Sequence, residues 1–171
     1  MKRLLAGPIV LILILGTFLY ATPAYAVGGT VCAKPSGKIT ITPGLTTVKK
    51  VQTIVINLPV KTCKGGGVTS GTNKGSIVTA PINVATFAAG KPVKLNSKIT
   101  WNTKKTSTWN ASATTKIVGT AITSTIKGKV TAGLFKGSAV TTVVGVKLGT
   151  PGAGGAIKTL IVTGKAPFAI K

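Results

Sequence analysis

Residues 38–58, KITITPGLTTVKKVQTIVINL, decide the fold class. Their first five residues alternate, so that Ile39 and Ile41 share one face of an extended chain while Lys38 and the two threonines share the other. A Pro-Gly turn signal then separates this run from a second one that is rich in Val and Ile. Such alternation is typical of a strand with one buried face, so the segment predicts β-structure.

The same theme recurs along the rest of the chain. Further runs of Val, Ile and Thr, such as SIVTAPINVATF, KITWNT, AITSTIKGKVTA, SAVTTVVGVKL and IKTLIVTG, are separated by turn clusters such as PSG, KGGG, TNKG, AAGKP and TPGAGG. β-Branched runs with turns at short intervals are typical of an all-β fold. We expect a single antiparallel β-sandwich with Greek-key, Ig-like or jelly-roll-like connections, and no helix of ten or more residues after the N-terminal segment.

The N-terminus has the pattern of a secretory signal peptide. Lys2 and Arg3 precede an almost wholly apolar run over residues 4–20, and ATPAYA ends in an Ala-x-Ala pattern at Ala24 and Ala26. This pattern predicts cleavage after the second of these alanines.

Cleavage there makes residues 1–26 a signal peptide helix and residues 27–171 a single exported domain, secreted or associated with the cell envelope. The alternative is an uncleaved membrane anchor, because the apolar run approaches the ~20 residues that span a bilayer. Once the signal peptide is removed, we expect no membrane span.

Composition excludes most enzyme classes. The chain has 22 Lys and Arg, no Asp, Glu or His, and a formal net charge of +22. Glycosidase carboxylate pairs, Ser-His-Asp triads and Cys-His dyads therefore cannot form. Metal sites need thiolate, imidazole or carboxylate ligands. We expect no enzymatic activity, no metal and no cofactor.

One residue spacing that is known from enzymes is present in the sequence. Ser124 and Lys127 match the S-x-x-K spacing of serine acyltransferases, which requires a helix turn to bring the two side chains together. The surrounding residues alternate like a strand, where residues three apart point to opposite faces. We interpret the match as coincidence, and no nucleotide-binding glycine motif accompanies it.

The single sign of the charge favours an anionic partner. Wall polymers that carry phosphate, anionic lipid headgroups, acidic polysaccharide and stray nucleic acid are candidates. The absence of arginine from the exported domain makes base-specific nucleic-acid recognition improbable. The densest points are the doublets Lys49-Lys50 and Lys104-Lys105, which we assign as anion contacts.

A second hypothesis gives the lysines a structural role. Lysines that flank β-strands commonly prevent edge-to-edge aggregation. The protein would then be a structural or self-associating exported protein whose lysines act only as solubility gatekeepers. This hypothesis leaves the absence of Asp and Glu unexplained, because mixed charges would solubilise as well. The oligomeric state stays open.

Cys32 and Cys63 are an even pair in an exported chain, which predicts one intramolecular disulfide. The glycine run that follows the second cysteine, CKGGGVTSGT, is either an anion-binding nest of backbone amides or, more simply, a flexible turn.

Aromatic side chains are few. Phe87, Phe135 and Phe168 are expected in the core. Trp101 and Trp109 lie in KITWNTKKTSTWNAS, and their positions depend on the hairpin turn. A two-residue turn at the lysine pair places the tryptophans on opposite faces, whereas a three-residue loop over residues 104–106 places them on one face, as a core pair or an exposed platform. We expect at least one in the core.

Several of these segments together resemble a known group. GKITITPGLT, CKGGGVTSGT, KITWNTKKTST and GLFKGS are similar, in this order, to uncharacterised secreted β-rich proteins of actinomycetes. The resemblance implies export, one sandwich-like domain and a disulfide between the first two cysteines. It implies no catalytic residues.

Overall fold

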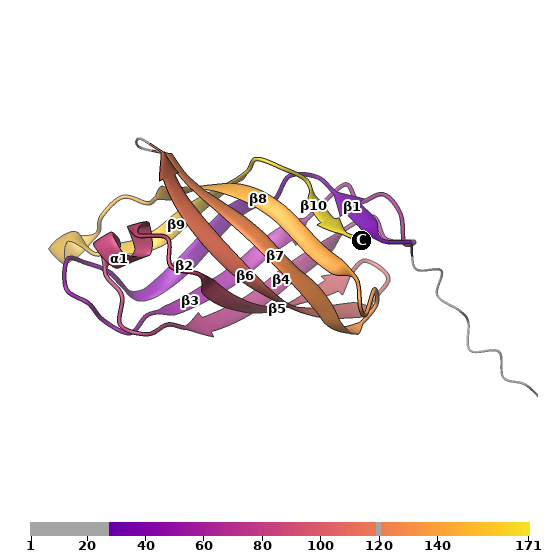
Figure 1. The fold of residues 1–171 in the computed structure, drawn as a ribbon, viewed down its shortest axis with the longest axis horizontal. Coiled ribbons are helices and arrows are strands. Elements are labelled where there is room, and N and C mark those ends of the chain that lie inside the picture. The colour runs from indigo at the N-terminus through magenta and orange to yellow at the C-terminus, as the bar shows by residue number, and fades with distance from the viewer. Residues whose placement is uncertain (1–27, 119–120) are drawn as a thin grey trace, which may run out of the picture.

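The computed structural model describes residues 28–118 and 121–171 (Figure 1). The predicted signal peptide, residues 1–26, lies outside the described residues. The strands are β1 Thr30–Cys32, β2 Ser36–Leu45, β3 Thr53–Val60, β4 Gly71–Val78, β5 Val93–Trp101, β6 Thr106–Val118, β7 Ala121–Gly133, β8 Ala139–Leu148, β9 Ile157–Gly164 and β10 Phe168–Ile170. A short helix, α1 Val84–Ala88, and a 3₁₀ turn, η1 Ala153–Gly155, complete the elements.

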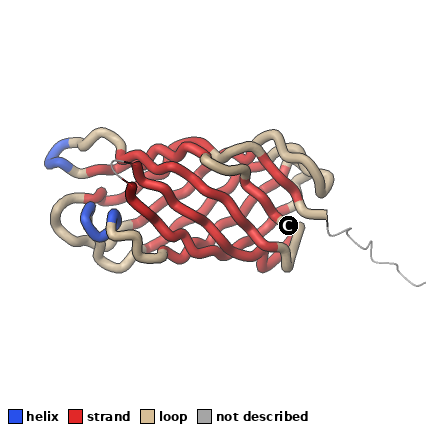
Figure 2. Tube along the Cα trace, turned by 45° about the horizontal axis from the view of Figure 1, so that its top comes forward, coloured by secondary structure: helices blue, strands red, loops and turns tan. Residues whose placement is uncertain are grey.

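The strands form one antiparallel sheet that closes on itself. β2 to β8 pair in sequence order, and β9 pairs with β2 on one side and with β8 on the other. The result is an eight-stranded up-and-down barrel, which Figure 2 shows from a second angle. The fold is therefore all-β, but the predicted β-sandwich with Greek-key connections is wrong, because the β8–β9 pairing joins what would otherwise be two separate layers.

The terminal strands complete the barrel wall at one end. β1 pairs with β10, and β10 pairs with the start of β8. On its other side, Val31 of β1 exchanges backbone hydrogen bonds of 3.0 and 2.9 Å with Lys64. β1 thus continues the wall position of β2, and β10 continues that of β9.

The two ends of the barrel differ, and we name them by their contents. The helix end holds residues 46–52, 79–92 and 149–156, which include α1 (Figure 1). The disulfide end holds residues 61–70, 102–105 and 134–138, together with β1 and β10.

Alternation directs apolar side chains into the lumen. In β3 and β5 every second residue is buried, as in Ile54, Ile56 and Leu58 on β3. Ile41 on β2 is fully buried, and Lys38 on the same strand is exposed, as predicted from the opening segment. The core is therefore a column of side chains inside the barrel.

Two local predictions were wrong. The TNKG cluster was expected to be a turn, yet it lies within β4. Gly75, the glycine of that cluster, has no room for a side chain, because a Cβ there would collide with the Ser97 side chain and the Asn96 carbonyl. The run SIVTAPINVATF was expected to be a strand, but it leaves the sheet after Val78 and ends in α1. Asn83 caps that helix and forms a capping box with Thr86.

Among the described residues, no helix is long and apolar enough to span a bilayer.

The Cys32–Cys63 disulfide is present, which confirms that prediction. Both cysteines are buried, next to the hydrogen-bonded Val31–Lys64 pair. The bond therefore fixes β1 to the chain that leaves β3, across the seam at which the terminal strands complete the wall.

Removing this bond should destabilise the barrel. A Cys32→Ala/Cys63→Ala variant removes a cross-link between residues 31 positions apart. We expect the free energy of unfolding to fall by about 3–4 kcal/mol, because the unfolded chain regains loop entropy. Urea denaturation measures the change, and reduced wild-type protein is the control that should match the variant. A loss below ~1 kcal/mol would contradict the structural role.

Candidate functional site

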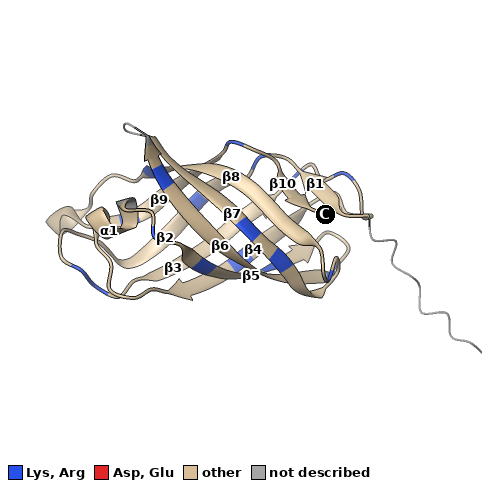
Figure 3. Ribbon diagram, in the orientation of Figure 1, with Lys and Arg blue, Asp and Glu red and all other residues tan. Residues whose placement is uncertain are grey.

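The outer face of the barrel carries charge of one sign. Every lysine from Lys34 to Lys171 is exposed, and the chain has no Asp or Glu to neutralise them (Figure 3). Lys74 on β4 lies directly opposite Lys98 on β5, an arrangement of like charges that disfavours folding. The exterior thus carries electrostatic repulsion that the packing of the core must offset.

The lysines are spread unevenly over this surface. Strands β4 to β7 carry Lys74, Lys94, Lys98, Lys116, Lys127 and Lys129, whereas β3 carries none. The two predicted doublets lie at opposite ends of the barrel, since Lys49-Lys50 precedes β3 at the helix end and Lys104-Lys105 follows β5 at the disulfide end. The structure therefore does not bring the four predicted anion contacts into one site.

The β5–β6 turn differs from both loops expected for it. The Lys104 N–H donates to Trp101 O at 2.9 Å, and the Trp101 N–H donates to Lys105 O at 2.9 Å. Residues 102–104 thus form a three-residue loop, with Lys104 at a φ of 65° in the left-handed position of such hairpins. This geometry places both lysines at the tip of the hairpin.

A hollow of about 950 Å³ lies beside that tip. Lys104, Lys105 and Lys136 line it, together with the backbone of Gly66 and Gly67 from the glycine run. The sequence-based assignment missed Lys136, because it is a single lysine within GLFKGS. Lys136 lies in the β7–β8 connection, and an up-and-down barrel brings this connection to the same end as the β5–β6 turn. That position in the strand order was the signal that could have identified it.

A buried hydrogen-bond chain holds the two turns together beneath the hollow. The Trp101 Nε1–H donates to Ser107 Oγ at 2.8 Å, and the Ser107 hydroxyl donates to Leu134 O at 2.6 Å. Phe135 packs edge-on against Trp101, with ring centroids 5.7 Å apart. Gly66 lies against the Phe135 ring, where any side chain would collide. The positions of Lys105 and Lys136 are therefore tied to one packed core.

Both tryptophans lie inside the barrel. Trp101 is 1% exposed and Trp109 is 2% exposed. The Trp109 Nε1–H donates to Asn73 Oδ1 at 3.2 Å, and its ring centroid lies 6.0 Å from that of Phe168. They fill the lumen at different heights and form no exposed aromatic platform. Phe168 is buried with them, while Phe87 and Phe135 are half-buried against the core.

The S-x-x-K pair is split between the two faces of β7. Ser124 is buried and Lys127 is exposed, so their side chains point in opposite directions. Within the described ranges, no three residues among His, Cys, Asp and Glu are grouped as a metal site would require. The arrangement of lysines on the surface is suited to attracting anions.

Ser107 is expected to be essential for this end of the barrel. Ser107→Ala leaves the buried Trp101 N–H and the Leu134 carbonyl without their partner, and we expect a loss of roughly 1–3 kcal/mol in the free energy of unfolding. Ser112→Ala on the same strand alters an exposed side chain and should change stability by less than about 0.5 kcal/mol. Equal urea midpoints for the two variants would contradict the stabilising role of the hydrogen bonds made by Ser107.

Comparison of this chain with protein-family models, with curated proteins and with solved structures finds no match. The resemblance to secreted actinomycete proteins accordingly stays a prediction, and function is inferred from the residues themselves.

Proposed function

We propose that this protein is an exported, non-enzymatic binding protein that associates through its lysines with anionic polymers of the cell envelope or extracellular space. The observation that supports this most directly is the one-signed exterior, in which every described lysine is exposed and no carboxylate side chain exists. A surface of this kind attracts polyanions over a Debye length of about 10 Å at 0.1 M salt.

Barrel closure favours this function over the gatekeeper hypothesis. Lysines protect sheets whose edge strands have unpaired backbone groups. The eight barrel strands each have a partner on both sides, so few such edges remain to be protected. Many of the lysines lie on central strands such as β5 and β7, where they prevent no edge pairing. Their abundance is better explained by a ligand.

The hollow at the disulfide end is the proposed first contact. Three lysines converge there from two connections, and exposed glycine backbone lies beside them. A phosphate of a wall polymer fits this setting, because it accepts hydrogen bonds from both ammonium groups and amides. The remaining lysines then bind the rest of the polymer through electrostatic contacts that depend neither on the sequence of the polymer nor on its exact position.

A charge-matched pair of variants tests this assignment. Lys104→Gln/Lys105→Gln/Lys136→Gln removes three charges at the hollow, and Lys49→Gln/Lys50→Gln/Lys91→Gln removes three at the helix end. At an anionic surface each lysine contributes about 1 kcal/mol, so we expect the first variant to bind inorganic polyphosphate roughly a hundredfold more weakly. The affinity of the control variant for polyphosphate should fall less than about fivefold, because this variant keeps the three lysines at the hollow.

Titration of wild-type protein with polyphosphate at low salt, and again at moderate salt, completes the test, with uncharged dextran as the blank. Binding should weaken steeply as salt increases. Absence of binding at low salt would refute the proposed function, and equal losses in the two variants would refute the hollow as its centre.

Self-association is a second candidate, and an apolar area supports it. Val55 on β3 and Val78 on β4 are 43% and 70% exposed and lie diagonally across the two strands. Val48 and Val51, whose side chains are 61% and 50% exposed, precede β3. This area faces outward from the lysine-free strand β3. Sedimentation at near-physiological salt distinguishes the candidates, since a strictly monomeric profile would exclude self-association.

A further inference from the structure

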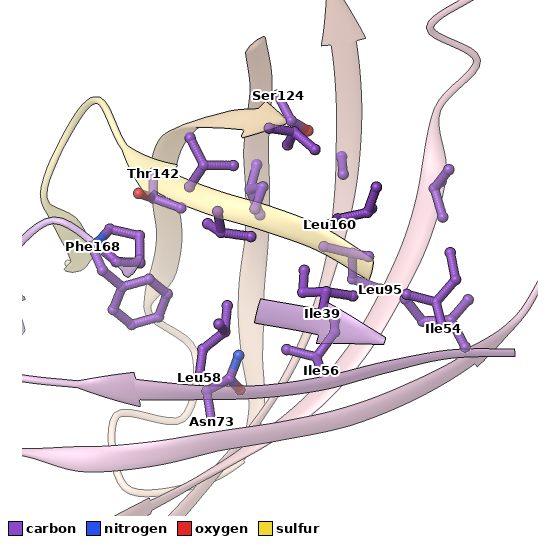
Figure 4. Close-up of a pocket in the computed structure, with 18 of the residues that line it drawn as sticks. Ile39, Ile54, Ile56, Leu58, Asn73, Leu95, Ser124, Thr142, Leu160 and Phe168 are labelled. Carbon is purple, nitrogen blue, oxygen red and sulfur yellow. The ribbon is translucent and has the colours of Figure 1, made fainter. Parts of the chain in front are cut away.

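The lumen of the barrel contains a partly open space that the surface function does not use. Its volume is about 130 Å³, and the side chains around it come from all eight barrel strands and from α1 (Figure 4). Most of them are Ile, Leu, Val or aromatic residues. An apolar cavity of about 150 Å³ stays dry and is known to accept a molecule the size of benzene. The space therefore suits a compact apolar ligand.

The cavity wall carries few polar side chains. Among the described residues that line it, these are Asn73, Thr115, Ser124 and Thr142. The Thr142 hydroxyl donates to Ala166 O at 3.3 Å and so is already engaged. In Figure 4, Ser124 lies across the space from Asn73. The polar groups are therefore spaced apart around the cavity wall, so a small ligand contacts one of them at a time.

Asn73 has a donor left over for a ligand. The Trp109 indole N–H can only donate, so the amide oxygen of Asn73 must face it, as the 3.2 Å hydrogen bond shows. The orientation of the amide is thereby fixed, and its Nδ2 group points elsewhere. Nδ2 forms no hydrogen bond to any described residue, and it retains some accessible surface, because Ser97 Oγ is the one fully buried side-chain polar atom without a partner in the described part of the chain. The amide extends from β4 into this space (Figure 4).

An amide N–H that faces the cavity without a protein acceptor gains a hydrogen bond when a ligand supplies the acceptor. A purely apolar ligand would leave the amide unpaired. A charged ligand would lose its hydration without gaining a counter-ion, because every described lysine is exposed on the outside of the barrel. The chemistry of the wall thus selects an uncharged molecule with one acceptor.

The two ends of the lumen are sealed differently. At the disulfide end, Trp101 and Phe135 pack edge to face, and the cavity reaches Ala33, next to the disulfide. At the helix end, the cavity reaches Phe87 of α1, which is only half-buried. α1 is attached to the loop before β3 by a backbone hydrogen bond from Val84 N–H to Thr46 O at 3.1 Å. Phe87 is therefore the half-exposed part of the cavity wall at this end.

We propose that the lumen is a binding site for a compact, uncharged, mainly apolar molecule, about the size of a six-membered ring, whose single acceptor is held by Asn73 Nδ2. This site is independent of the lysine surface and goes beyond the polyanion association.

Cyclohexanone and methylenecyclohexane are suitable probes, because they share one shape and differ in the acceptor. Both should bind the wild-type protein. Trp109 lines the cavity and Trp101 does not, so a change in tryptophan emission reports on the site, and calorimetry gives the affinities. Failure of both probes to bind at millimolar concentration would overturn the proposal.

Asn73→Leu tests the hydrogen bond. In this variant the affinity ratio of ketone to alkene should fall about five- to tenfold, as expected for loss of one buried hydrogen bond. Binding of the alkene serves as the internal control, since it shows that the variant keeps a folded lumen. An unchanged ratio would refute the role of Asn73.

Ala113→Leu tests the location. Ala113 is buried and lines the cavity, so three added carbon atoms occupy much of its volume, and neither probe should bind. Thr114→Leu places the same side chain on the outer face of β6 and should leave both affinities unchanged. Binding to the Ala113 variant at wild-type affinity, or its loss in the Thr114 variant, would show that the site lies elsewhere.

Discussion

The pairing of β9 with β8 is the interaction on which the rest of the structure depends. Five residue pairs, from Val144↔Gly164 to Leu148↔Leu160, join these strands and convert a curved sheet into a closed wall. Without them β9 would remain an edge strand attached only to β2. Closure gives every barrel strand one face toward a dry lumen and one face toward solvent. The simple alternation of the sequence then becomes a separation between inside and outside.

This separation allows two unlike chemistries to occupy neighbouring residues. On β5, Val93 and Leu95 line the lumen, while Lys94 and Lys98 between and beyond them face solvent. The lysine surface and the apolar cavity are thus two sides of the same strands. A register slip of one residue would bury the lysines and expose the core, so the charges themselves specify the register.

Strand positions were largely predictable, because alternation is a local signal. Closure was not, because a sandwich and a barrel place the same alternation on strands with one buried face. What distinguishes them is the choice of partners by β9, and one sequence carries no record of which distant strands pair. The TNKG segment shows a second limit: its glycine suggests a turn locally, but in β4 that glycine leaves room for the Ser97 side chain.

The candidate sites were less predictable than the strands. Lys104 and Lys105 were identified as a doublet, but Lys136 joins them only through the order of the strands. Asn73 gave no functional signal at all, since its role depends on the indole N–H of Trp109, 36 residues away. Val143 on β8 is half-buried although it lies on the face opposite to Val140 and Val144, and the amides of Lys165 and Ala166 donate to its carbonyl.

The pairing of β1 with β10 has a consequence for the order in which the molecule can form. Thr30 lies opposite Ile170, so a wall segment at the disulfide end requires residues from both extremes of the described chain. A nascent chain cannot complete that wall until residue 170 has left the ribosome, however early its local hairpins assemble. Synthesis and completion of this wall segment are therefore separated in time, although the β8–β9 pairing that closes the barrel needs no residue beyond Gly164.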